Sequence, residues 1–472
     1  MRDAMTDLVV LIPGFGGSVL ERDGRVLWGA GGEASIATLL ALGDDALPLL
    51  GLTKDDASRA ELADGISATG VITGTHMLPD VWKIDGYARM PQLLGRLFDV
   101  EPGRNYLEFA YDWRRDLRAA AKALDRSAEG WLEEFRERSG NPDARLVLVA
   151  HSMGAIVARY FLEALDGWKH ARALVTFGAP FRGVPALMGA LTGSAPQIRL
   201  GGGEFGELLG SFTSLYQLLP VYPAVQAGEG EDVPLQRVTE VEIPGLDPER
   251  VGMAMELWTD IDEAMKRHHG NPAYREGAYR LLPIVGTAQS TAQSARLVDG
   301  KLTLLNTYQN RDLSGDGQVP RVAAQPTDTG DAPGTLLTAG RHGELQHDDR
   351  AMSYVLGLFT SLYLDADIIA PPVRSKIGLD LVLADAVDVD APVMVKVRPE
   401  SAEVGALVAT LEHASTGEEV ARAGLTAEGD RWYGAEFSVR APGIYRVRAT
   451  GDGGVQPVSD VFEAVPAGTI RG

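Results

Sequence analysis

The stretch between residues 146 and 165 combines a buried-strand pattern, a tight turn and a helical pattern. Residues 146–149 read Leu-Val-Leu-Val, residues 150–154 read Ala-His-Ser-Met-Gly, and an apolar helical pattern follows to residue 165. A continuous apolar run of this kind suits a strand covered on both faces of a parallel sheet. A sharp strand-to-helix turn tolerates only small neighbours, and residues 150 and 154 are small. The segment therefore predicts an α/β chain.

Similar apolar runs recur at residues 8–12, 173–177 and 281–285. Helical patterns lie between them, notably at residues 116–138, and another is expected at residues 348–364. Alternating buried strands and helices are typical of an α/β domain with a mostly parallel central sheet. We assign this domain to residues 1–369.

Residues 184–278 depart from that alternation and predict a helical insertion. A glycine triplet at 201–203 precedes apolar residues spaced three to four apart, namely Phe205, Leu208, Leu209, Phe212, Leu215, Leu218 and Leu219. This spacing fits one apolar face of a helix. Periodicity alone leaves two interpretations open, an ordinary core helix or a lid that covers a site.

The last hundred residues have a different pattern of apolar and turn-forming residues. Ala-Pro-Pro at residues 370–372 reads as a linker. Short alternating segments follow, punctuated by turn residues such as Pro442-Gly443. We therefore expect residues 373–472 to form a small β-sandwich of the immunoglobulin or fibronectin type.

Composition excludes several classes of function. The 472 residues include no cysteine, which rules out disulfides and a thiol nucleophile. The formal net charge of -21 makes the chain a poor non-specific binder of nucleic acid or of anionic membranes. The apolar run at residues 8–12 is too short for a signal peptide, and no transmembrane segment is expected. These features predict a soluble cytoplasmic protein without a cofactor or metal.

Ser152 is the candidate nucleophile. It stands between the strand pattern and the helix pattern, which is the context of the nucleophile elbow in α/β-hydrolases. The turn holds the serine in a strained backbone conformation and projects its hydroxyl near the start of the helix, where developing negative charge is favoured. The alternative is a structural serine at a turn.

A serine nucleophile needs a base, and the order of the triad in α/β-hydrolases is serine, acid, histidine. Of the eight histidines in the chain, His342 and His347 lie late enough in the first domain and outside the insertion. We favour His347 because it directly precedes the expected final helix. His342 stays open as the alternative.

The acid is expected in a loop before that histidine. Asp316 lies in a glycine-flanked turn at residues 314–320, and Asp312 is its competitor. Its carboxylate would orient the imidazole and stabilise the imidazolium. The oxyanion donors are expected to be the backbone N–H of Met153, which follows the nucleophile, and that of Phe15 in the glycine-rich loop at residues 13–17.

These segments together resemble the lecithin:cholesterol acyltransferase family, which includes lysosomal phospholipase and phospholipid:diacylglycerol acyltransferases. The landmarks are residues 11–18 (the oxyanion loop), 110–114 (Ala-Tyr-Asp-Trp-Arg), 150–154 (the elbow), 178–183 (Gly-Ala-Pro-Phe-Arg-Gly), 214–220, 315–317 and 346–347. The resemblance spans about residues 7–365. It implies an α/β-hydrolase fold and acyl transfer from a lipid ester through an acyl-serine, with Ser152, Asp316 and His347 as triad and Phe15 and Met153 as oxyanion donors.

Two functions follow as hypotheses. The first is a serine hydrolase of the lipase, phospholipase or esterase type, with or without O-acyl transfer. Its apolar lid would open at a neutral or zwitterionic lipid surface, because the acidic chain gains little from anionic lipid. The second is an effector or interaction protein whose β-sandwich recruits a partner while the hydrolase fold serves as a scaffold.

Overall fold

The structure is a computed structural model that describes residues 3–29, 49–53, 64–78, 82–84, 86–96, 98–193, 203–230, 232–326, 335–363, 377–401, 404–452 and 454–469, with the single positions 55, 59 and 62. Its buried apolar side chains form one cluster between Met5 and Phe359 and another between Leu379 and Ala464. The linker expected at residues 370–372 lies outside the described residues.

A six-stranded parallel sheet forms the centre of the first cluster. Its order is β17 (Leu336–Thr338), β14 (Arg280–Gly286), β11 (Ala171–Phe177), β10 (Leu146–His151), β2 (Leu8–Ile12) and β9 (Tyr106–Glu108). Every residue of β2 and β10 is buried, as expected for strands covered on both faces. The α/β class with a parallel central sheet is therefore confirmed.

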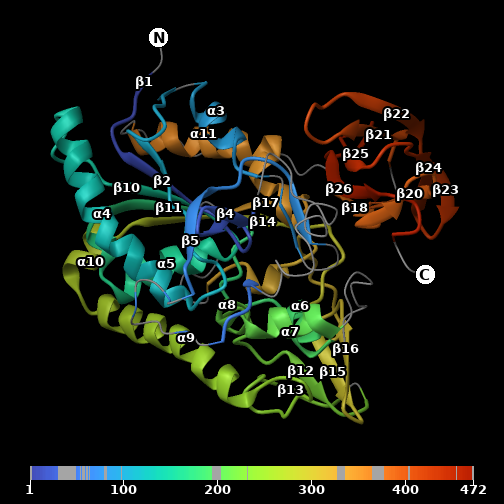
Figure 1. Ribbon diagram of the computed structural model, residues 1–472, viewed down its shortest axis with the longest axis horizontal. Coiled ribbons are helices and arrows are strands. Elements are labelled where there is room, and N and C mark those ends of the chain that lie inside the picture. Colours follow the sequence, from blue (N-terminus) through green and yellow to red (C-terminus); the bar gives the residue numbers. More distant parts are fainter. Residues whose placement is uncertain are drawn as a thin grey trace.

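Helices cover both faces of this sheet. Figure 1 shows α11 (Asp349–Tyr363) and α5 (Gly154–Ala164) on opposite sides of it, with α4 (Leu117–Ser139) at its far end. Capping sets the limits of α4, since the Asp116 side chain accepts the N–H of Arg118 and Gly140 ends the helix at a φ of 69°. No helix among the described residues is long and apolar enough to cross a membrane.

Smaller elements surround the first strands. The remaining ones before α4 are β1 (Asp3–Ala4), β3 (Ser18–Arg22), β4 (Arg25–Trp28), β5 (Ile66–Val71), β6 (His76–Leu78), β7 (Trp82–Ile84), α3 (Arg89–Leu94) and β8 (Phe98–Asp99). Three short 3-10 helices follow later in the chain, η1 (Gly167–Lys169), η2 (Arg321–Ala323) and η3 (His342–His347).

The insertion between β11 and β14 is a cap. It contains α6 (Ala186–Thr192), α7 (Gly203–Ser211), α8 (Thr213–Gln217), β12 (Val225–Ala227), β13 (Leu235–Gln236), α9 (Pro248–His269) and α10 (Pro272–Gly277). The hairpin β15 (Ser294–Val298) and β16 (Lys301–Leu305) joins its small sheet from beyond β14. The apolar pattern at 205–219 is two helices rather than one, because Phe212 adopts an extended backbone between them.

The C-terminal region consists of two packed sheets (Figure 1, orange to red). One has the order β18 (Leu379–Val382), β20 (Pro392–Pro399), β24 (Trp432–Ser438) and β23 (Thr426–Gly429). The other has the order β19 (Ala386–Asp388), β26 (Val458–Val465), β25 (Gly443–Gly451), β21 (Leu407–His413) and β22 (Glu419–Gly424). Burial alternates along β20, as the sequence pattern predicts for a strand with one face in a core. The expected all-β architecture is confirmed.

Candidate active site

Ser152 lies at the sharp turn between β10 and α5. Its φ of 51° is a left-handed backbone conformation that costs free energy in any residue other than glycine. The Ser152 N–H donates to the Phe177 carbonyl at 2.8 Å. A Cβ at Gly154 would come within 2.3 Å of the Pro13 carbonyl oxygen, so the turn needs glycine at this position. The local sterics inferred from the sequence are thus visible in the backbone.

The Ser152 hydroxyl is hydrogen-bonded to a histidine that is itself held by a carboxylate. The Ser152 Oγ lies 2.8 Å from His342 Nε2, and His342 Nδ1 lies 2.8 Å from Asp316 Oδ2. All three side chains are buried. Since an ionised carboxylate only accepts hydrogen bonds, Nδ1 carries the ring proton and Nε2 accepts the proton of the serine. An imidazole in this position can withdraw that proton during nucleophilic attack.

The geometry corrects the choice between the two late histidines. His342 begins η3 and reaches Ser152, whereas His347 ends η3. Five residues of a 3-10 helix advance by about 10 Å. His347 instead lines a separate cavity of about 330 Å³ that faces the β-sandwich. The short strand β17, which the sequence analysis did not identify, ends at Thr338 and would have favoured His342 as the histidine next after a strand.

The hydrogen bonds of Asp316 and Asp312 distinguish between these two candidate acids. The second oxygen of Asp316, Oδ1, accepts the N–H groups of Gln318 and Val319 at 3.0 and 2.7 Å. Asp312 instead accepts Gln293 Nε2 and the N–H of Ser314, so its side chain holds the loop in shape. Asp316 is therefore the carboxylate brought to His342.

Gly178 allows these groups to approach the sheet. Its φ is 56°, and a Cβ there would lie 2.9 Å from both Asp316 Oδ2 and His342 Nδ1. This glycine begins the segment 178–183 that the sequence analysis singled out. Because Gly178 has no side chain, Asp316 and His342 have room to form their hydrogen bond at this position.

The loop at residues 13–17 lies beside the elbow. Tyr111 Oη donates to the Pro13 carbonyl at 2.8 Å, and Trp28 Nε1 donates to the Gly16 carbonyl at 2.7 Å. Phe15 is buried in this loop, and Met153 is buried at the start of α5. The first backbone N–H groups of a helix have no acceptor within the helix, which suits Met153 for binding an anion. The assignment of Phe15 and Met153 as oxyanion donors stays a prediction.

The Tyr-Asp-Trp-Arg segment supports that loop. Trp113 Nε1 donates to the Ser18 carbonyl at 3.1 Å. The Arg114 guanidinium is fully buried and binds both carboxylate oxygens of Asp112, at 2.8 and 2.6 Å. Its other donors reach Asp64 Oδ2 and the Leu50 carbonyl, both at 3.0 Å. A guanidinium with this many partners anchors the segment firmly.

A second histidine connects the oxyanion loop to η3, and the sequence analysis gave it no role. The Gly14 N–H donates to Tyr87 Oη at 2.8 Å, and Tyr87 Oη lies 3.0 Å from His151 Nδ1. His151 Nε2 lies 3.1 Å from the His342 carbonyl oxygen. Because an amide only donates, Tyr87 gives its proton to Nδ1, and the Nε2 proton goes to the carbonyl.

This arrangement requires a neutral His151. Burial, and secondly the charge of His342, lower the pKa of His151 from 6.5 to about 3. Burial likewise raises the pKa of the Tyr87 hydroxyl well above its usual value, so this hydroxyl keeps its proton. The series of hydrogen bonds from the Gly14 N–H through Tyr87 and His151 to the His342 carbonyl therefore contains no charged group. Each member of the series donates to the next.

Part of the cap packs against the loop at residues 13–17 and against Trp113. Phe212, between α7 and α8, packs against Trp113 at 5.6 Å and Phe15 at 6.3 Å between ring centroids. Ser152 is only 7% exposed. The side chain of Phe205, which was expected to share this role, lies outside the described residues.

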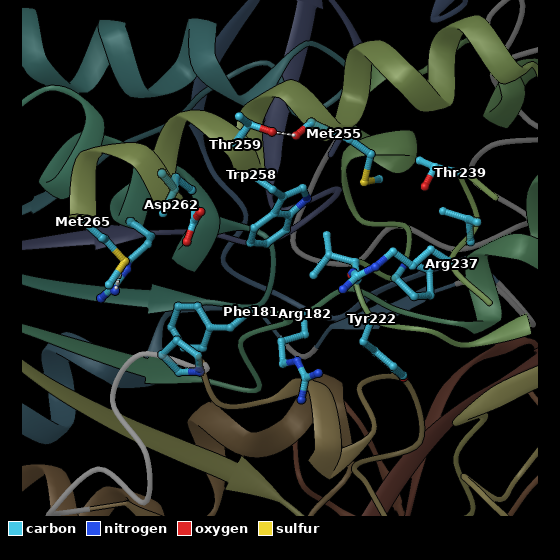
Figure 2. A pocket seen from close by; sticks show the side chains of 16 residues that line it. Phe181, Arg182, Tyr222, Arg237, Thr239, Met255, Trp258, Thr259, Asp262 and Met265 are labelled. Carbon is cyan, nitrogen blue, oxygen red and sulfur yellow. Dashed lines mark hydrogen bonds between the residues drawn. The ribbon is translucent and has the colours of Figure 1, made fainter. Parts of the chain in front are cut away.

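A cavity of about 490 Å³ lies under helix α9, and Ser152, Asp316 and His342 are not among the residues that line it (Figure 2). Helix α9 forms one wall with Met255, Trp258 and Met265, and the opposite wall includes Phe181 and Arg182. Phe181 follows Gly178 by three residues, so this wall continues directly from the segment that touches Asp316 and His342.

Comparison with known proteins gives a family match. Residues 69–262 match the family described as Lecithin:cholesterol acyltransferase. An uncharacterized protein of Saccharomyces cerevisiae is 30% identical over 115 residues, which is 24% of this chain and 16% of the yeast protein. This chain therefore spans only a small part of that curated relative.

Solved structures similar to the chain include the Bacillus licheniformis lipase BlEst2. Its propeptide form is 12% identical, with a TM-score of 0.38 and coverage of 98% of this chain and 94% of that chain. Its mature form is 12% identical, with a TM-score of 0.36 and coverage of 76% and 94%. Residues 69–262 thus match the lecithin:cholesterol acyltransferase family, in agreement with the resemblance seen in the sequence.

Proposed function

We propose that this protein is a serine hydrolase of lipid esters that works through an acyl-serine intermediate and passes the acyl group to water or to an alcohol. The observation that carries the proposal is the hydrogen-bonded series Ser152–His342–Asp316, with 2.8 Å at each step. His342 replaces His347 in the mechanism.

The reaction begins when His342 Nε2 takes the Ser152 proton as Oγ attacks the ester carbonyl carbon. The carbonyl oxygen becomes an oxyanion, which the N–H groups of Phe15 and Met153 are proposed to bind. Asp316 keeps the imidazole oriented and stabilises its positive charge. The imidazolium then protonates the leaving alcohol as the C–O bond breaks, which leaves an ester on Ser152.

The second half restores the enzyme. His342 takes a proton from water or from an acceptor alcohol, whose oxygen attacks the acyl-serine carbonyl. The second tetrahedral species collapses, His342 returns its proton to Ser152 Oγ, and a fatty acid or a new ester leaves. The chemistry of the two acceptors is identical, so access to the site decides between them.

The cavity lined by α9 and Phe181 is the proposed place for substrate hydrocarbon. Its walls include Phe181, Trp258, Met255 and Met265, which offer apolar surface and adaptable packing. Its guanidinium groups at Arg182 and Arg237 suit a polar head. Opening of the cap at a neutral or zwitterionic lipid surface and a cytoplasmic location stay predictions.

A fluorophosphonate probe, which labels activated serines, tests the proposal. The wild-type protein should label and should hydrolyse p-nitrophenyl esters, and Ser152→Ala should do neither.

His342→Ala should lower kcat by about three orders of magnitude or more, since loss of a triad base commonly costs that much. The matched control His347→Ala should leave kcat within about twofold of wild type, because a side chain outside the hydrogen-bonded series is not in the reaction path. Normal labelling of Ser152→Ala, or loss of activity only in His347→Ala, would contradict the assignment.

A lipid panel then separates the two acceptors. Products read by mass spectrometry, with and without added alcohol, show whether free fatty acid or a new ester is formed. Formation of neither from any lipid, in protein that labels at Ser152, would limit the activity to small esters.

A further inference from the structure

The β-sandwich contacts the segment that carries His342 and a second segment that lies against the Asp316 loop. The face involved consists of β18, the start of β26 and the residues just before β26. It approaches residues 286–291, which lie against the Asp316 loop, and residues 338–348, which contain His342. The contacts are polar, directional and largely buried, unlike those of a module that is merely tethered.

Gln289 connects β18 to the Asp316 loop. Its Nε2 donates to the Leu379 carbonyl at 2.8 Å, and its Oε1 accepts the Leu381 N–H at 3.2 Å. Its own backbone N–H donates to the Gly315 carbonyl at 3.0 Å. The side chain is 2% exposed, so each of these bonds is costly to lose. One residue thereby joins a sandwich strand to the residue before Asp316.

Arg341 connects the sandwich to the histidine. Its Nε lies 3.1 Å from Asp460 Oδ2, and its Nη1 donates to the Leu381 carbonyl. The next residue is His342, whose backbone N–H donates to the Asp316 carbonyl at 2.8 Å. A displacement of Arg341 would therefore move the imidazole and the acid loop together.

The charges at this contact are balanced. Asp460 is almost fully buried and also binds Lys83 at 3.1 Å, and Lys83 binds Asp385 at 2.5 Å. Two cations and two carboxylates alternate across the boundary between the domains. Removing one member leaves a buried charge without its partner, which is strongly unfavourable.

Gln456 holds the segment that leads into η3. Its Nε2 donates to Thr338 Oγ1 at 2.6 Å and to Asp348 Oδ2 at 3.2 Å, and its Oε1 accepts the Ala339 N–H at 3.2 Å. Thr338 ends β17, and Asp348 follows η3. The sandwich thus binds the His342 segment on both sides of the histidine.

We propose that the C-terminal β-sandwich is an intramolecular positioning element that sets the distance of His342 from Ser152 and of Asp316 from His342. Arg341, Gln289 and Asp460 are positioning residues that act through the two loops. The inference depends on the proposed function, because positioning matters only if the triad reacts. It differs from a partner-recruiting role, since the face described here is already occupied by the protein itself.

Asp460→Asn in the full chain tests this, because it keeps the shape of the side chain and removes the charge that Arg341 and Lys83 share. Two quantities are measured with the fluorophosphonate probe, namely the fraction of molecules that label and the rate constant of labelling. Misplacement of a catalytic group by about 1 Å costs up to about 100-fold. We therefore expect full labelling with a rate constant lowered 10- to 100-fold, and a lower kcat with KM nearly unchanged.

The matched control is Lys396→Met, which breaks the Lys396–Glu428 pair inside the sandwich, away from the described boundary. Its rate constant should equal that of wild type. If Asp460→Asn labels at the wild-type rate constant, positioning is excluded, whether or not fewer molecules are folded. If Asp460→Asn does not fold, Arg341→Lys gives the same comparison, because it keeps the charge but loses the planar fork of donors. Failure of the wild-type protein to label would instead refute the proposed function.

Discussion

At the scale of single residues, the site depends on backbone positions that accept only certain side chains. Ser152 has a positive φ, and Gly154 lies so close to residues 12 and 13 that no Cβ fits. The stability lost in this strained turn must be recovered from the buried strand and helix around it. Adding even one methyl group at Gly154 is therefore expected to lower the stability of the elbow.

Gly154→Ala should be strongly destabilising. The added Cβ would lie 2.3 Å from the Pro13 oxygen and 2.6 Å from the Ile12 oxygen, both of which are backbone atoms. Overpacking of this kind costs about 1–3 kcal/mol or more. Gly130→Ala is the control, because Gly130 lies on an exposed part of α4 with open space at its Cβ and should gain up to about 1 kcal/mol from helix propensity. Urea unfolding of the two variants measures the difference, and equal midpoints would show that the turn is not tight.

The neutral His151 makes stability depend on pH. Its folded pKa of about 3 lies below the unfolded value of 6.5, so the unfolded chain binds the extra proton between these values. The stabilisation is complete above pH 6.5 and is lost as the pH falls toward 3, by at most about 1.4 kcal/mol per pH unit. His151→Gln should lack this part of the slope. Urea unfolding at a series of pH values from 7.5 to about 4.5 tests it, and equal slopes for both proteins would refute the neutral assignment.

At the scale of elements, η3 and α9 decide which side chains face the site. The length of η3 separates His342 from His347, whereas the linear sequence favoured His347 and left His342 as the alternative. Helix α9 places Met255 and Trp258 in the cavity while Met253, two residues earlier, is 48% exposed. The helical period determines which residues share a face, and this can be read from the sequence. The way the elements pack determines what each face contacts.

Chain-length specificity tests the role proposed for the α9 face. Met255→Trp should fill part of the cavity and lower kcat/KM for long-chain p-nitrophenyl esters about tenfold, since excluding two methylene groups from apolar contact costs about 1.6 kcal/mol. Activity on the acetate ester should be unchanged. Met253→Trp adds the same bulk to the exposed face of α9 and should have no effect on either ester. If the loss were equal for acetate and long-chain esters, the cavity would not be the acyl site.

At the scale of the whole molecule, two hydrophobic cores contribute to the proposed active site. The first core builds the sheet and the elbow, and the second carries strands whose ends bind Arg341 and Gln289. Recruitment of a partner by the sandwich was a reasonable hypothesis from sequence, since alternating strands give no sign of what their edges contact. In the structure, one face of the sandwich instead binds Gln289, Arg341 and Thr338, which lie next to the Asp316 loop and the His342 segment.

The sequence by itself determined the parallel sheet, the elbow at Ser152 and the order of serine, acid and histidine. These features depend on local sterics and on the periodicity of apolar residues, both of which can be read along the chain. Only the tertiary structure decided that His342 reaches Ser152, that His151 joins two loops through Tyr87, and that the β-sandwich contacts the segments next to Asp316 and His342. Those contacts join residues far apart in the chain, and their geometry follows from how complete elements pack together.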